Sequence, residues 1–562
     1  MTTIKQPLSK IRVKAGSGPQ ILIVVASVTT IFISLIEMFR GALAVGISTD
    51  EPESISLLEQ GINGTWDPAG YWGVLPGSIA FTKGNTFQIL SHVANIVRGN
   101  ESWGVFAYSA ESYAVQHLVI VALAVITMAA VGLSVWLITN SFTASVFGVA
   151  VLSAMPVFIG HAMFNPKDIP TATGFTILTT GCIILLTGSQ RISKPTSAKK
   201  FLAPNIWGSL FIFFGFWLGA GMRFALWLPF LLLTFFAAAI IWVTRKSKAA
   251  LLAPISALAA VAAVALSHPH YLPYWDIWLR SSISNSANHT WGASLGSLVG
   301  GERMTGDSLT WWYLPAWVFG SLPLLLIGLT LLGVIVALYQ VVAKQTELSQ
   351  KSVRLLVLAQ AFGLPLASVV TGAIMYNAQR LHMYMFPALA VLAGLGFKWL
   401  FSAASAHKNL RTRRIWQWVI AGTGAFALLY PTLERLQLHP YQYTYLNEVA
   451  TIGGINDRWE TDYYNASLRE AITRLPTDVY PYFFGPPENM DTYFYLRGLN
   501  HDPNNVAAED EYWRINVTVS GRTMPGNCRD VDSVTRNFRG EDVVMSWVGI
   551  CKELPGGRSE NQ

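Results

Sequence analysis

Residues 21–54 read ILIVVASVTTIFISLIEMFRGALAVGISTDEPES, an apolar run that ends directly before a cluster of acids. The apolar part, 21–46, is long enough to cross a bilayer, which takes about 20 residues as a helix. Four basic residues precede it. A cleaved signal peptide has a shorter apolar core and a small-residue cleavage site, so we interpret this run as a retained transmembrane helix.

Ten further apolar runs of spanning length follow it along the chain. They lie at 114–139, 142–160, 171–188, 205–222, 224–243, 249–267, 313–340, 355–376, 383–402 and 415–433. The chain is 13% charged, about half of the roughly 25% found in soluble proteins. Charge is costly in hydrocarbon, which explains the deficit. The sequence therefore predicts an α-helical polytopic membrane protein with about 11 transmembrane helices.

The distribution of charge predicts the orientation of these helices. With a cytoplasmic N-terminus, the inside segments hold 18 Lys and Arg and one acid, Glu347. The first outside loop, 47–113, holds seven acids and two bases, Lys83 and Arg98. This is the pattern of the positive-inside rule, and it leaves no basic surface that predicts a nucleic-acid partner. We expect a multi-pass protein of the plasma (inner) membrane with an extracytoplasmic C-terminus.

The last 130 or so residues have a different composition, with many acids, Tyr, Asn and Pro and no run that could span. We therefore divide the chain into a membrane domain, 1–433, and a small extracytoplasmic α/β domain, 434–562. A helix is expected at 465–474 and strands at 515–519 and 543–550. Cys528 and Cys551 lie in this domain, where the compartment permits oxidation, and we expect one disulfide between them.

Charged residues gather in the outer loops, which are predicted at 47–113, 161–170, 268–312 and 377–382. The adjacent acids Asp50 and Glu51 could supply a general base and a metal or substrate ligand, or could simply form an acidic turn in a solvated loop. Lys167 and Asp168 lie between two prolines in a tight turn, which holds them rigidly near the membrane surface. The alternative for Lys167 is an interfacial anchor.

Two arginines also lie at outer helix ends. Arg223 follows a glycine-rich helix end, and Arg380 opens a late span. A guanidinium at either position could hold a lipid phosphate with two hydrogen bonds, or could serve as an interfacial anchor. Within the first span, Glu37 and Arg40 are three residues apart and share a helix face, which predicts a structural ion pair.

Together these features resemble the GT-C superfamily of glycosyltransferases that use polyprenyl-phosphate sugars. The branch most similar contains protein O-mannosyltransferases and the lipid A aminoarabinose transferase. The resemblance is carried by Asp50-Glu51 after the first span, by Asn165-Pro166-Lys167-Asp168 and by Arg380, together with segments 439–448 and 460–464. It covers the membrane region and the start of the tail.

The resemblance implies a catalytic base at Asp50 with Glu51 beside it, and a second acid at Asp168. It also implies phosphate-binding cations, for which Lys167, Arg223 and Arg380 are the candidates. A divalent metal cation, held by Asp50 and Asp168, is a candidate cofactor. The implied reaction moves a sugar from a polyprenyl-phosphate donor to a hydroxyl of a glycan, lipid or protein acceptor, with inversion at the sugar.

Two other classes of protein compete with the enzyme. A transporter or flippase of lipid-linked sugars usually places ionisable residues near the membrane midplane and often has repeated halves. Here the spans are nearly free of charge, apart from Glu37 and Arg40, and the two halves are not similar. A non-catalytic scaffold would not need acids and cations gathered on one face. We therefore expect an enzyme.

Overall fold

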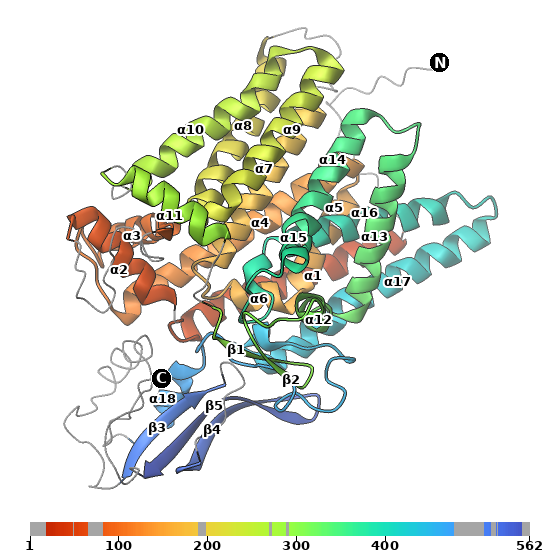
Figure 1. Ribbon diagram of the computed structural model, residues 1–562. Helices are drawn as coiled ribbons and strands as arrows, with labels where there is room; N and C mark the ends of the chain where they lie inside the picture. Colours follow the sequence, from red (N-terminus) through yellow and green to blue (C-terminus); the bar gives the residue numbers. More distant parts are fainter. Residues whose placement is uncertain are drawn as a thin grey trace.

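The computed structural model describes residues 18–48, 50–65, 82–188, 198–268, 273–287, 292–476, 511–518, 524 and 526–552. Long helices run through the upper part of the molecule, and a small sheet lies beneath one end of them (Figure 1). The fold is thus a helical membrane protein with a small C-terminal sheet domain, as predicted.

Within these residues, eight helices are long and apolar enough to cross a membrane. They include α1 (Gly18–Ala44), α4 (Ala110–Thr139), α7 (Asp168–Gly188), α9 (Trp227–Arg245), α10 (Leu252–Ser267), α13 (Leu324–Val342) and α16 (Met385–Ser405). The eighth combines α14 (Leu348–Leu358), a π-helical turn (Ala359–Gly363) and α15 (Leu364–Thr371). The other apolar runs form α5 (Phe142–Ala154), α6 (Pro156–His161), α8 (Ala198–Ala220), α12 (Tyr313–Ser321) and α17 (Leu410–Glu434).

All 11 predicted runs are thus helical, but two are broken by proline. The run 142–160 divides at Pro156 into α5 and α6, and the run 313–340 divides before α13, which follows Pro323. Proline cannot donate the backbone hydrogen bond that would continue the preceding helix. The number of crossings therefore stays a prediction, while the helical class is confirmed.

The predicted outer loops contain secondary structure that the hydropathy pattern did not indicate. The loop 47–113 holds α2 (Asp50–Asn63) and α3 (Thr86–Arg98). The loop 268–312 holds α11 (Trp275–Ala287) and an antiparallel hairpin of β1 (Gly296–Val299) and β2 (Glu302–Thr305). Three acids occupy the first turn of α2, where the positive end of the helix dipole stabilises their negative charge. Asp50 consequently begins a helix rather than a loop.

Close backbone contacts hold α7 against α8 in the middle of the bundle. A Cβ atom on Gly174 would collide with the backbone of Gly219, and one on Gly215 would collide with the backbone of Leu178. Small residues allow membrane helices to approach in this way. Almost all of α7 is buried as a result, and its first residue, Asp168, is fixed by the surrounding helices.

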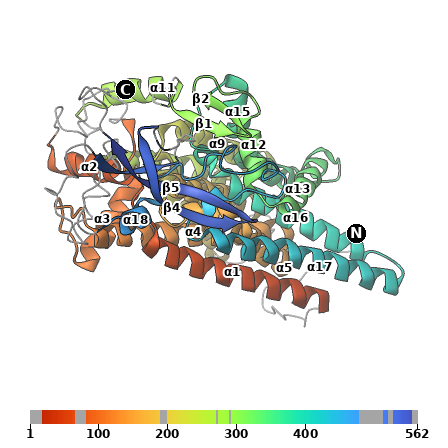
Figure 2. The ribbon, with the colours of Figure 1, turned by 90° about the horizontal axis from the view of Figure 1, so that it is seen from below.

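The ion pair predicted between Glu37 and Arg40 is wrong, because Glu37 pairs with Arg435. The Arg435 guanidinium is fully buried and lies 2.6 Å from Glu37 Oε2. It also donates to Ser34 Oγ at 2.6 Å and to the carbonyl of Ser153. This contact joins α1, α5 and the residues that follow α17, and it satisfies both buried charges. Figure 2 shows α1 and α17 side by side, in agreement with this link.

The C-terminal sheet has three antiparallel strands in the order β3-β5-β4. They are β3 (Glu511–Val517), β4 (Cys528–Phe538) and β5 (Glu541–Lys552), and α18 (Leu468–Thr473) precedes them. The expected helix and two of the strands are present, but β4 was not predicted because most of its first half is exposed and polar. Cys528 and Cys551 occupy paired positions on β4 and β5 and form a disulfide.

The segment between α17 and α18 packs against the membrane helices rather than leaving them. Its tyrosines Tyr443, Tyr463 and Tyr464 are almost fully buried. Gly160 of α6 allows the close approach, since a Cβ atom there would collide with the backbone of Tyr443. The start of the tail therefore reaches the ends of the helices where Asp50, Asp168 and Arg380 lie.

Candidate active site

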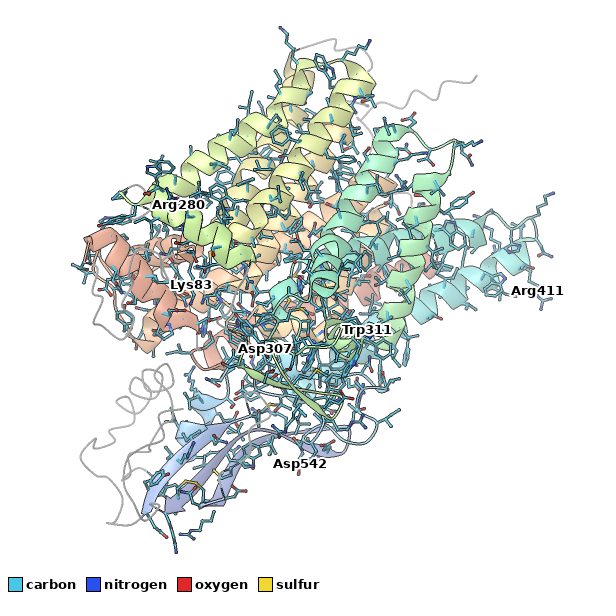
Figure 3. The ribbon with its side chains drawn as sticks, viewed as in Figure 1. Lys83, Arg280, Asp307, Trp311, Arg411 and Asp542 are labelled. Carbon is cyan, nitrogen blue, oxygen red and sulfur yellow. A yellow bond between two sulfur atoms is a disulfide. The ribbon has the colours of Figure 1, made fainter. Side chains whose placement is uncertain are left out.

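Three elements that are distant in the sequence begin at one place. Asp50 is the first residue of α2, Asp168 is the first residue of α7, and Arg380 is the first residue of a short 3-10 helix, η6 (Arg380–His382). Figure 3 shows Lys83, which borders this region, beside the N-terminal helices and above the sheet that carries Asp542. Arg411, by contrast, lies at the far end of α17.

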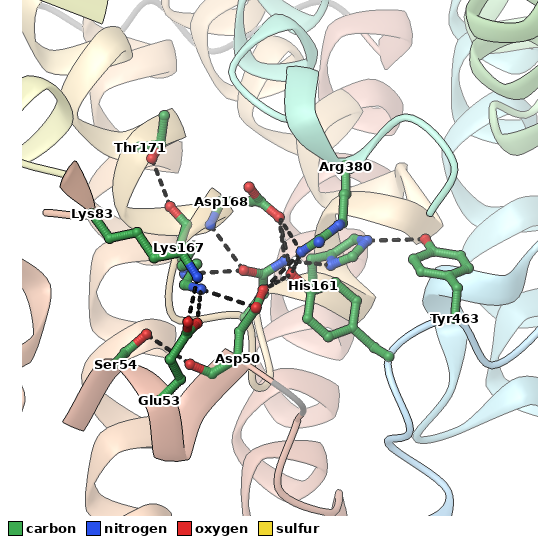
Figure 4. A network of polar contacts seen from close by, with 12 residues as sticks. Asp50, Glu53, Ser54, Lys83, His161, Lys167, Asp168, Thr171, Arg380 and Tyr463 are labelled. Atoms are coloured by element: carbon green, nitrogen blue, oxygen red, sulfur yellow. Dashed lines mark hydrogen bonds and ion pairs between the residues drawn. The ribbon is translucent and has the colours of Figure 1, made fainter. Parts of the chain in front are cut away.

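The Asp50 carboxylate lies between two cations (Figure 4). Lys167 Nζ donates to its Oδ1 at 2.9 Å, and Arg380 Nη1 donates to its Oδ2 at 2.8 Å. The hydroxyl of Tyr464 also donates to Oδ2, at 3.1 Å. Burial by itself would raise the pKa of Asp50, but Lys167 and Arg380 hold this pKa well below its usual range. Asp50 is therefore ionised throughout the physiological range of pH.

A second carboxylate, Glu53, extends the cluster by one turn of α2. It accepts hydrogen bonds from Lys167 Nζ at 3.3 Å and from Lys83 Nζ. Burial works against the charged form of Lys167, but the carboxylates of Asp50 and Glu53 outweigh it and raise the pKa of the ammonium. The ammonium of Lys167 thus stays protonated and bridges the two acids.

The Asp168 carboxylate is almost completely buried and has three partners. Asn165 Nδ2 donates to its Oδ2 at 2.8 Å, and the Tyr464 hydroxyl, whose single proton is shared with Asp50 Oδ2, lies 3.2 Å from the same oxygen. Arg223 Nη2 donates to its Oδ1. The backbone N–H of Asp168 in turn donates to Asn165 Oδ1 at 2.8 Å, which caps the start of α7. The predicted turn 161–170 is therefore rigid, as its two prolines suggested.

Arg380 connects the two catalytic candidates. Its Nη1 lies 3.7 Å from Asp168 Oδ2 as well as 2.8 Å from Asp50 Oδ2. The guanidinium carbon lies over the rings of Tyr376 and Tyr464, at 5.0 and 4.6 Å from their centroids. These rings hold the cation in one orientation and shield it from water, which strengthens its electrostatic effect.

A series of buried hydrogen bonds connects the cluster to residues of the tail. His161 Nε2 lies 3.0 Å from the hydroxyl of Tyr463, and its Nδ1 lies 2.9 Å from Asn165 Nδ2. Burial lowers the pKa of His161 to about 3, so the ring is neutral. These hydrogen bonds link the tail to Asn165 and through it to Asp168.

The structure brings together five of the six predicted site residues and separates the sixth. Glu51 is fully buried and faces away from the cluster. Its Oε1 accepts from Gln116 Nε2 and is paired with His117 Nε2, both at 2.8 Å, and its Oε2 accepts from the backbone N–H of Ser48. Consecutive residues of a helix point about 100° apart, which explains why Asp50 and Glu51 diverge. Glu51 fixes the start of α2 in this arrangement.

The balance of charge in the cluster suits an anion better than a metal cation. The described residues place four cations around three carboxylates, for a formal charge of +1. The cations are those of Lys83, Lys167, Arg223 and Arg380, and the carboxylates are those of Asp50, Glu53 and Asp168. Arg380 Nη1 lies between the two acids that could share a metal. The described part of the chain contains no group of three or more His, Cys, Asp or Glu that could hold an ion. This arrangement does not fit a divalent cation, and we derive no step through one.

The fold is similar to that of an oligosaccharyltransferase from Archaeoglobus fulgidus, solved in the apo form, with a TM-score of 0.52 and 15% sequence identity. The similarity covers 85% of this chain and 60% of that chain. This chain therefore spans about 60% of the length of that protein. The comparison confirms the class of fold that the sequence predicted, a helical membrane protein with a small C-terminal domain.

Two further solved structures are similar at lower TM-scores. ArnT from Cupriavidus metallidurans, bound to undecaprenyl phosphate, has a TM-score of 0.46 and 13% identity, and the match covers 95% of this chain and 98% of that chain. AglB from Archaeoglobus fulgidus, in complex with an inhibitory peptide and a dolichol-phosphate, has a TM-score of 0.48 and 13% identity over 85% of this chain and 59% of that chain. No protein-family model and no curated protein matches the sequence.

Proposed function

We propose that this protein is an inverting glycosyltransferase that moves a sugar from a polyprenyl-phosphate donor to an acceptor hydroxyl at the outer face of the membrane. The observation that carries the proposal is a buried cluster with one more cation than it has carboxylates, at the outer ends of membrane helices. Such a site attracts the phosphate of a lipid whose tail remains in the bilayer. The fold shared with an oligosaccharyltransferase is consistent with this class of transfer.

In the proposed reaction, Asp50 acts as the general base. It accepts the proton of the acceptor hydroxyl, and that oxygen forms a new bond to the anomeric carbon of the sugar. The bond from this carbon to the phosphate oxygen breaks, and the electron pair remains on the departing lipid phosphate. Attack from the side opposite the phosphate inverts the anomeric centre. Lys167, Arg223 and Arg380 stabilise the charge that develops on the leaving group.

The present contacts of these cations suggest how the donor activates the base. Lys167 and Arg380 are both paired with Asp50, and this pairing weakens its basicity. A donor phosphate that binds the two cations would compete with Asp50 for their hydrogen bonds. Asp50 would then recover basicity only when the donor is in place. Asp168 keeps Arg223 and Tyr464 as partners and orients the cations.

The proposed orientation places the N-terminus in the cytoplasm and the C-terminal domain outside. Its support is the sorting of basic residues to one set of loops. In this orientation the charged cluster faces the outer leaflet of the plasma membrane. The donor sugar and the acceptor would meet there, outside the reach of cytoplasmic nucleotide sugars.

Transfer from a defined donor tests the proposal. The purified full-length protein, in lipid nanodiscs, is incubated with synthetic undecaprenyl phosphates that carry radiolabelled mannose, glucose or aminoarabinose, together with an extract of cell-envelope acceptors. We expect protein-dependent release of undecaprenyl phosphate from one of these donors and movement of label to the acceptor fraction. A deletion strain should accumulate the same lipid-linked sugar and lack one envelope linkage. A deletion strain whose lipid-linked sugars and glycans are unchanged would refute the proposal.

A further inference from the structure

His382 lies two residues after Arg380 and has one ring nitrogen without a partner. The residue is only 5% exposed. Its Nδ1 lies 2.7 Å from the hydroxyl of Tyr384, whereas its Nε2 has no hydrogen-bond partner within the described residues. Buried polar atoms nearly always have a partner, and an exception beside a candidate site indicates a place for a ligand atom.

The environment of His382 determines where its proton lies. Burial, and then the Arg223 guanidinium, lower the pKa of the ring to about 4 in spite of the Asp168 carboxylate. The ring is therefore neutral and carries one N–H. The phenol of Tyr384 carries one O–H, which can donate to Nδ1. When Tyr384 is the donor to Nδ1, the ring proton lies on Nε2, which is then an uncharged donor.

Other polar atoms on the same short segment also lack partners. Arg380 Nε is unpaired among the described residues, although its Nη1 is not. The side chain of Gln379 is 1% exposed, and neither its amide oxygen nor its amide nitrogen has a partner in the part of the chain that the structure describes. Segment 379–382 thus carries three donor groups and one acceptor that are buried and unused.

The chemistry of these atoms distinguishes a sugar from a phosphate. The oxygens of a phosphate diester only accept hydrogen bonds, and the cations of the cluster already suit them. The amide oxygen of Gln379 needs a donor, which a sugar hydroxyl supplies. An uncharged N–H such as that of His382 suits an uncharged oxygen, and hydroxyls can satisfy both kinds of atom at once.

We propose that segment 379–382 binds the sugar of the lipid-linked donor, and that His382 Nε2–H donates to one of its oxygens. The inference rests on the proposed function. It assigns to His382 the discrimination between a sugar-bearing lipid and the bare lipid phosphate. The sugar then lies beside Gln379 and His382, while the phosphate lies among the cations. Specificity for hydroxyl positions would reside in this turn.

The test compares two lipids on full-length variants in nanodiscs. The probes are undecaprenyl phosphate and undecaprenyl phosphates that carry mannose, glucose or aminoarabinose, and the dissociation constant of each is measured. The variants are His382→Leu, which removes the N–H, His382→Gln, which keeps an amide donor, and Tyr384→Phe, which removes the group that fixes the tautomer. His407→Leu, at an exposed site between α16 and α17, is the matched control.

We expect the wild-type protein and His407→Leu to prefer one sugar-bearing lipid over undecaprenyl phosphate. In His382→Leu the ratio of the two dissociation constants should fall about tenfold, or about 1.4 kcal/mol, while the affinity for undecaprenyl phosphate stays unchanged. His382→Gln should retain most of the preference. Tyr384→Phe should weaken the preference as well, so the test remains decisive if His382→Leu does not fold. Equal losses for both lipids, or an unchanged preference in His382→Leu and Tyr384→Phe, would overturn the inference. A wild-type protein that binds none of the lipids would instead refute the proposed function.

Discussion

Replacing Asp50 with asparagine removes one carboxylate charge from the cluster while preserving the size of the side chain. General acid–base catalysis is worth about 10²–10⁴-fold in rate, or about 2.7–5.4 kcal/mol of activation free energy at 1.36 kcal/mol per tenfold. We therefore expect Asp50→Asn to lower turnover by that factor. Folding should survive, because Lys167 keeps Glu53 as a partner and Arg380 keeps Tyr464.

The same change should strengthen binding of the product lipid. Asp50 accepts one charged hydrogen bond from Lys167 and one from Arg380, and its side chain is 13% exposed. Hydrogen bonds to charged groups are worth about 1.5–3 kcal/mol each, and a phosphate no longer has to compete for them. We expect the dissociation constant of undecaprenyl phosphate to fall about tenfold. A merely destabilised protein would not bind its ligand more tightly.

The assay measures sugar transfer and, separately, lipid binding by purified protein in nanodiscs. Asp307→Asn changes an exposed acid two residues after β2; it is the matched control and should behave as the wild type. If Asp50→Asn transfers sugar at the wild-type rate while Asp168→Asn is inactive, the base is Asp168. If neither substitution matters, the glycosyltransferase proposal is refuted.

The pH dependence gives a second test of the same reasoning. A general base must be ionised, so activity is lost as the pH falls through its pKa. In the free protein, burial raises the pKa of Asp50, but Lys167 and Arg380 outweigh this and hold it well below the usual value, so kcat/KM should have no acid limb from Asp50 above about pH 4. If the donor phosphate takes both cations, the pKa rises in the complex and kcat should decline at a higher pH than kcat/KM does. Coincident acid limbs would contradict the proposed exchange of partners.

Three further predictions concern the phosphate site, the C-terminal domain and the orientation. The Arg380→Lys protein should lose most of its activity, because an ammonium cannot reproduce the two parallel hydrogen bonds of a guanidinium or its contact with the tyrosine rings. Wild-type turnover in this variant would favour the alternative role of Arg380 as an interfacial anchor. Mass spectrometry of native membranes should find Cys528 and Cys551 joined, a bridge that contributes roughly 3 kcal/mol through loop closure, and two free thiols would contradict this. A cytoplasm-specific reporter should be active when fused after Ser247 and silent after Gln562, and activity at the second site would reverse the orientation.

Hydropathy and charge predicted the class of fold because the bilayer imposes both patterns directly on the sequence. Spanning helices must be apolar, and their short cytoplasmic loops are basic. Asp50, Asp168 and Arg380 could be proposed together for the same reason, since the charge pattern predicts that each lies at an outer helix end. Two-dimensional topology is enough to assign such residues to one side of a membrane.

Contacts that depend on three-dimensional packing were not accessible in this way. Tyr464 meets Asp50 across 414 positions of sequence, and nothing in the tail indicated that it folds back onto the helices. Lys83 and Glu53 pair within a loop whose helices lack a spanning pattern. Glu51 is adjacent to Asp50 in sequence, but helix geometry turns it toward His117. Neighbours in sequence and neighbours in the site are therefore different sets.

The contact between Glu37 and Arg435 has a consequence for how the protein is made. The two residues are 398 positions apart, so α1 enters the membrane with an uncompensated acid long before the ribosome reaches the arginine. An unpaired buried charge costs several kcal/mol, and the nascent bundle stays incomplete until α17 has been inserted. A chain truncated before residue 435 should consequently be recognised by membrane quality-control proteases, even though it contains α1 to α17.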